Sequence, residues 1–118
     1  MPKRISIQLP FRTQHLLLEA LLESYPDEVI TGFLVDAYVS CSCVIGNAYK
    51  AWSYPEHALL TSGEISEVVQ YEHRWLIKTR ENDCLVIVNF ARGGRQSLLH
   101  LIELFQTARL THSDWCIH

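Results

Sequence analysis

The chain has 118 residues, of which 48% are hydrophobic and 19% are charged, a composition typical of one globular domain with a substantial core. Ten Lys and Arg against thirteen Asp and Glu give a net charge of −3 with neutral histidines, so nucleic acid is not an expected partner. No stretch has the length and hydrophobicity of a membrane span, and the basic N-terminal residues lack the apolar core of a signal peptide. We therefore expect a soluble, cytoplasmic domain without membrane insertion.

The N-terminal third predicts a strand, a helix and a second strand. Residues 5–9 alternate apolar and polar side chains and stop at Pro10, as expected of a first strand. Thr13 can cap a helix that continues to about Ser24, because leucines recur there at three- and four-residue steps. Residues 30–45 are rich in Val, Phe, Tyr and Thr and predict one long strand.

The remainder of the chain alternates between irregular and periodic segments. Residues 46–67 begin with Gly-Asn and predict a long excursion with a helical turn over 55–60. Residues 68–80 alternate again, and residues 84–90 form a nearly continuous apolar run, as a central strand covered on both faces would. A helix is expected over 97–108, where apolar residues form one stripe, and a terminal strand should follow it.

These elements predict a single α+β domain over residues 1–118. Their order is close to the ferredoxin-like split β-α-β sandwich, with an antiparallel sheet, two helices on one face and an extra hairpin strand. In that topology the terminal strand lies beside the first strand at a sheet edge, where unpaired backbone groups favour pairing with another subunit. A homo-oligomer is therefore expected.

Residue types that bind transition metals are concentrated at the C terminus, at every second position: His112, Asp114, Cys116 and His118. An extended strand would place all four on one side, with successive ligands about 7 Å apart, close enough to share a zinc or copper ion or to join ligands from a second chain. Cys41 and Cys43 would likewise share one side of a strand and suit the same metals. A half-solvated edge strand and buried core thiols are the plainer explanations of the two patterns.

A second candidate site is the segment Arg92, Gly93, Gly94 and Arg95, which precedes the predicted second helix. Glycines let backbone amides approach an anion, while the helix N-terminus and two arginines supply positive potential. A phosphate or nucleotide could bind there, although the same four residues also make an ordinary strand-to-helix turn. The sequence contains neither Gly-x-Ser-x-Gly nor His-Glu-x-x-His, so we assign no catalytic residue.

Several segments resemble small PII-like proteins. They are Leu9-Pro10 at a strand end, the leucine-rich run over 16–22, and Ile30-Thr-Gly32-Phe33 at the start of the next strand. Residues 66–80 and 98–115 are similar to the third strand and to the second helix with the last strand of such proteins. The families most similar are PII-like proteins encoded beside heavy-metal efflux pumps and, more distantly, the CutA divalent-ion tolerance proteins. The resemblance implies a trimeric sensor with ligand sites between subunits and no enzymatic turnover.

The preferred interpretation of the sequence is a homo-oligomeric sensor or regulatory protein that binds a metal ion, a small anionic metabolite, or both, at subunit interfaces. Two alternatives stay open. Residues 46–67, which contain Trp52, Tyr54 and His57, could dock onto a membrane transporter or another protein. A small-molecule enzyme could instead have its active site between subunits.

Overall fold

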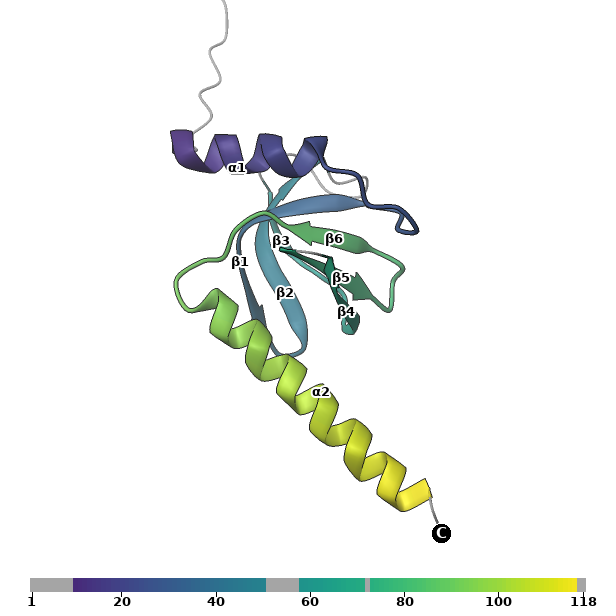
Figure 1. Ribbon diagram of the computed structural model, residues 1–118. Coiled ribbons are helices and arrows are strands. Elements are labelled where there is room, and N and C mark those ends of the chain that lie inside the picture. Colours follow the sequence, from purple (N-terminus) through teal and green to yellow (C-terminus); the bar gives the residue numbers. More distant parts are fainter. Residues whose placement is uncertain (1–9, 51–57, 72, 117–118) are drawn as a thin grey trace, which may run out of the picture.

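The computed structural model describes residues 10–50, 58–71 and 73–116, which form a sheet flanked by two helices (Figure 1). In chain order the elements are α1 (Phe11–Leu22), β1 (Gly32–Ser40), β2 (Cys43–Tyr49), β3 (Leu59–Thr61), β4 (Ile65–Tyr71), β5 (Arg74–Thr79), β6 (Cys84–Ile87) and α2 (Gly94–Cys116). The predicted α+β class is confirmed. The predicted first strand, residues 5–9, lies outside the described residues.

The six strands form one mixed sheet in the order β3-β2-β1-β6-β5-β4. β1 and β6 pair in parallel, whereas the other neighbouring strands are antiparallel. All four residues of β6 are buried, which confirms the prediction of a central strand in the apolar run over 84–90. The prediction of an antiparallel sheet is wrong at the β1–β6 pair.

The two helices cover opposite faces of this sheet. Phe33 and Val35 of β1 pack in the same cluster as Ala20 of α1, whereas Leu34 packs with Leu98 of α2. Both faces of β1 are apolar and therefore both need cover. The prediction that both helices lie on one face is thus wrong, and the ferredoxin-like split β-α-β arrangement is not confirmed.

Each of the two longest predicted strands is a hairpin. Residues 30–45 divide at Cys41 and Ser42, which have φ angles of 52° and 62°. Two consecutive residues with positive φ are characteristic of a two-residue type I′ turn, and neither residue here is the Gly or Asn that usually signals one. Residues 68–80 likewise divide between Tyr71 and Arg74.

The predicted excursion over 46–67 is more regular than expected where the structure describes it. β2 continues to Tyr49, β3 occupies Leu59–Thr61, and β4 begins at Ile65. The helical turn predicted over 55–60 is wrong at its end, since Leu59 and Leu60 are in β3; residues 51–57 lie outside the described residues.

α2 begins close to β1 and is longer than predicted. A Cβ atom on Gly94 would collide with the carbonyl oxygen of Ala37, and the backbone N–H of Val39 donates to Ser97 Oγ at 2.9 Å. From there α2 runs for 23 residues and extends past the sheet (Figure 1). Of the helices described, none is long and apolar enough to cross a bilayer.

Candidate functional site

The predicted C-terminal metal ligands do not lie on a strand. His112, Asp114 and Cys116 belong to α2, while His118 lies outside the described residues. The one-sided row of ligands depends on an extended strand, so it does not apply to residues in a helix. The terminal-strand prediction is therefore wrong over residues 112–116.

The cysteines of the first hairpin are separated by its turn. Cys41 is exposed at the turn, and Cys43 is half-buried at the start of β2. Among the residues that the structure describes, no group of three or more His, Cys, Asp or Glu side chains is placed to hold a metal ion. A zinc or copper site that includes these thiols stays a prediction.

The segment Arg92 to Arg95 connects β6 to α2. Gly93 has a φ of 77°, and Gly94 donates its backbone N–H to Ala91 O at 2.8 Å. Both arginines are exposed. The turn and the close approach to β1 account for both glycines, so the geometry explains this sequence without requiring a bound phosphate or nucleotide.

A carboxylate lies close to this segment. Asp36 has a φ of 55° and lies where the pairing of β1 with β2 shifts register. Its backbone N–H donates to Asn89 Oδ1 at 2.7 Å, and Asn89 Nδ2 donates to Asp36 Oδ1 at 3.3 Å. The negative charge of Asp36 reduces the positive potential available to an anion at this end of the sheet.

A groove of about 450 Å³ lies between α2 and the outermost part of the sheet. It is lined by apolar side chains from three elements, Val68 of β4, Trp75 of β5, and Ile102 and Phe105 of α2, with polar residues Ser66, Glu67, Gln70 and Gln106. The four apolar residues pack against the α2-side core but are only half-buried. The groove therefore exposes apolar surface that a ligand could cover.

Strand β4 forms one wall of the groove and is also the last strand of the sheet. Within the described part of the chain, β5 is the strand that pairs with it. The backbone N–H of Ile65 donates to Ser42 O at 2.8 Å, so the outer edge of β4 presents backbone N–H and C=O groups to an added strand over residues 66–70. Every second residue of such a strand would project toward the side of the sheet that carries α2.

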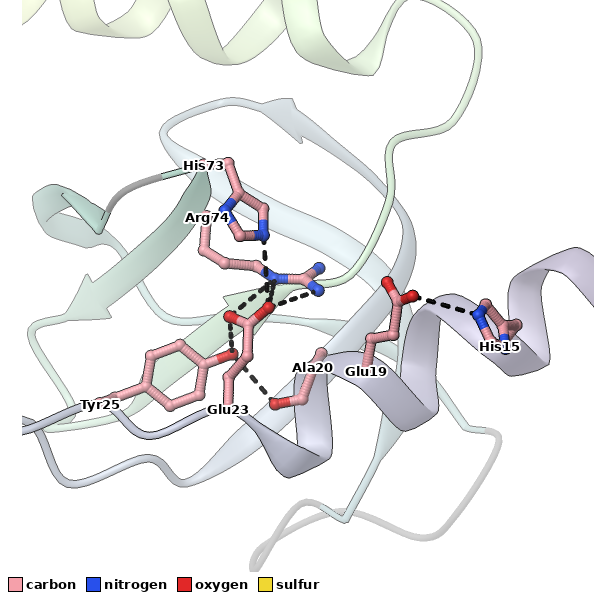
Figure 2. Close-up of polar contacts among 7 residues, drawn as sticks. All are labelled: His15, Glu19, Ala20, Glu23, Tyr25, His73 and Arg74. Carbon is pink, nitrogen blue, oxygen red and sulfur yellow. Dashed lines mark hydrogen bonds and ion pairs between the residues drawn. The ribbon is translucent and has the colours of Figure 1, made fainter.

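A polar cluster holds the β4–β5 hairpin to the end of α1 (Figure 2). Arg74, the first residue of β5, is only 6% exposed, and its Nη2 lies 3.1 Å from Glu23 Oε1. Its Nε lies 3.2 Å from Glu23 Oε2. His73 Nε2 is 3.3 Å from Glu23 Oε1, and Tyr25 donates its hydroxyl hydrogen to Ala20 O at 3.0 Å.

The charge on Glu23 is stabilised by this arrangement. The hydrogen bond from Arg74, reinforced by the charges of Arg74 and His73, lowers the pKa of Glu23 against an opposing effect of burial. Because Arg74 begins β5 and β5 pairs with β4, this ion pair fixes the position of the edge strand. We assign Glu23 and Arg74 a positioning role.

A second pocket, of about 350 Å³, lies on the other side of β4 and contains mostly polar residues: Asp27, Glu28, Val29, Ser66, Lys78, Thr79, Asn82, Asp83 and Cys84. Lys78 Nζ binds Glu28 Oε2 at 2.8 Å, and Asp83 accepts a hydrogen bond from Thr31 at 3.1 Å. Burial, reinforced by the nearby charge of Glu28, raises the pKa of Cys84 to about 11. The thiol is therefore protonated at neutral pH and is a poor nucleophile.

Comparison of the chain with protein-family models, with curated proteins and with solved structures found no match. The function must therefore be argued from the site. The groove was not predicted from the sequence, because its lining joins residues 66–75 and 102–106 through a strand order that periodicity does not reveal. Alternation over 68–80 was the only signal that pointed to it.

Proposed function

We propose that the chain is a protein-interaction module that binds an extended segment of a partner along β4, by addition of a strand to the sheet. The observation that carries this proposal is that the apolar groove is lined by β4, which is the last strand of the sheet. The segment's backbone would pair with β4, and its alternate side chains would enter the groove. An interaction module was one of the alternatives open from the sequence, although residues 46–67 were expected to supply its binding surface.

The groove can support a moderate affinity. Burial of two leucine-sized side chains against Val68, Trp75, Ile102 and Phe105 would contribute about 3–6 kcal/mol. Each backbone hydrogen bond to β4 would add about 0.5–1.5 kcal/mol. Ordering of the segment and loss of its free motion oppose these terms, so we expect dissociation constants on the order of micromolar.

Selection of random peptides displayed on phage against the immobilised full chain tests this proposal. The selected peptides should alternate apolar and polar residues, and substitution Ile102→Glu should abolish their binding because it places a charge in the groove. Leu104→Glu is the matched control, since Leu104 is on the same helix, is 52% exposed and does not line the groove. Peptides without alternation, or binding that survives Ile102→Glu, would contradict the proposal.

The sensor interpretation, with its PII-like resemblance and its trimer, stays a second proposal. The two exposed arginines that flank the start of α2 favour an anionic ligand over a cationic one at that place. Native mass spectrometry of untagged protein with zinc, copper(I) and adenine nucleotides tests it. Stoichiometric binding lost on Arg92→Ala and Arg95→Ala would support an anion sensor, and unchanged masses would oppose it.

A further inference from the structure

We infer that the edge of β4 and its groove bind residues 4–9 of a second copy of this chain, so that two copies exchange their N-terminal segments. This inference rests on the proposed function and names the occupant of the same groove. It is argued from the two faces of β4, from the charge beside it and from the position of α1.

The two faces of β4 require different side chains from an added strand. Val68 packs with the α2-side core, and Val69 packs with the α1-side core. Glu67 borders the groove, but it is the cross-strand partner of Lys78, whose ammonium binds Glu28, so the Glu67 side chain lies on the α1 side of the sheet. A complementary strand therefore has apolar residues toward α2 and a basic residue toward the α1 side, near Glu67.

Glu67 has a carboxylate that can accept this basic partner. It is exposed, and it forms no ion pair with another residue described in the structure. Lys78 attracts it electrostatically, but the Lys78 ammonium already binds Glu28 at 2.8 Å. An added Lys or Arg would thus be paired with a charge that is not yet neutralised by direct contact.

Residues 4–9 have the required pattern. Apolar residues occupy Ile5, Ile7 and Leu9, and polar residues occupy Ser6 and Gln8 between them. Arg4 falls on the polar side of this alternation, so it would project toward the α1 side when the apolar residues enter the groove. The alternating segment of five residues, 5–9, has the same length as the edge of β4 over residues 66–70.

The position of α1 indicates that the N-terminal segment binds the groove of a second copy and not the groove of its own chain. Leu9 lies one residue before Pro10, and α1 begins at Phe11. The other end of α1 contacts the β4–β5 hairpin through Glu23, and a helix of 12 residues is about 18 Å long. The start of α1 is thus far from β4 and on the opposite face from the groove (Figure 1). Exchange between two copies closes the assembly with two identical contacts.

Sedimentation equilibrium of the full chain and of paired variants tests this inference. Wild-type protein should form a dimer, and Ile5→Asp with Ile7→Asp should weaken it at least about tenfold. Ser6→Asp with Gln8→Asp is the matched control and should weaken it much less. Arg4→Glu should weaken the dimer, and Glu67→Arg in the same chain should restore it. Far-UV circular dichroism should show the same helix content in all variants.

A monomeric wild-type protein would overturn the inference, and so would a dimer that tolerates Ile5→Asp with Ile7→Asp. Either result leaves the proposed function to be judged separately, by the binding of selected peptides and its loss on Ile102→Glu. A dimer that is lost on Ile102→Glu but tolerates the N-terminal substitutions would also overturn it, because another part of the second copy would then occupy the groove.

Discussion

Substitution Glu23→Gln should destabilise the protein strongly, because it removes the charge that compensates a buried guanidinium. Arg74 is 6% exposed, and its Nε and Nη2 both contact the Glu23 carboxylate at 3.1–3.3 Å. Glutamine has nearly the same size but carries no charge and offers one acceptor oxygen. The Glu23→Gln variant therefore leaves the Arg74 guanidinium buried beside a side chain that cannot neutralise its charge.

The expected magnitude follows from the burial of each partner. Loss of charged hydrogen bonds and of compensation for a buried ion costs about 2–4 kcal/mol. Arg74→Met should cost only about 1–2 kcal/mol, because the methionine side chain retains most of the packing and the Glu23 carboxylate, 31% exposed, can be hydrated. The double variant, Glu23→Gln with Arg74→Met, should lose less free energy of unfolding than the sum of the two single losses, by at least about 1 kcal/mol.

Urea unfolding followed by tryptophan fluorescence measures these differences, and the same series gives their pH dependence. Since the pKa of Glu23 is lowered in the folded state, its contribution is complete above the unfolded-state pKa of about 4.3. The contribution is lost as the pH falls through the folded-state pKa. The gap in stability between wild type and Glu23→Gln should therefore narrow below about pH 4. A Glu23→Gln variant within about 0.5 kcal/mol of wild type at pH 7 would refute the reasoning.

Two further predictions concern the start of α2 and the buried thiol. Gly94→Ala should destabilise the protein by at least about 2 kcal/mol in urea unfolding, because its Cβ would collide with the backbone oxygen of Ala37. Gly93→Ala, whose Cβ meets nothing within 4 Å, should cost about 1 kcal/mol for its positive φ alone. In mass-spectrometric alkylation with iodoacetamide, exposed Cys41 should react well before Cys84, whose pKa is raised to about 11. Equal rates for the two thiols in the folded protein would contradict the burial of Cys84.

Periodicity in the sequence predicted those elements that are a single uninterrupted helix or strand. The leucine spacing located α1, and the continuous apolar run over 84–90 located the central strand β6. The hairpin at Cys41 and Ser42 was missed because its turn adopts positive φ without Gly or Asn. The alternation of ligands from His112 to Cys116 was too short to distinguish a strand from the end of a long helix.

The arrangement of the elements was harder to predict than the elements. Phe33, Leu34 and Val35 are consecutive and buried, which indicates a strand covered on both faces, but the residues do not say which helix covers which face. The groove is lined by both Trp75 and Phe105, which are far apart in sequence and come to the same groove because β5 lies near the end of the sheet that faces α2. Such a site becomes visible only once the strand order is known.

The most direct test of strand addition is amide hydrogen exchange, measured by NMR on isotope-labelled protein with and without a peptide selected on phage. If the peptide pairs with β4, amides over residues 66–70 that face away from β5 should exchange more slowly, and cross-strand contacts should join peptide protons to β4 protons. Protection confined to residues 46–61 or 92–95, with β4 unchanged, would contradict the account and move the binding surface to one of the sites that the sequence first suggested.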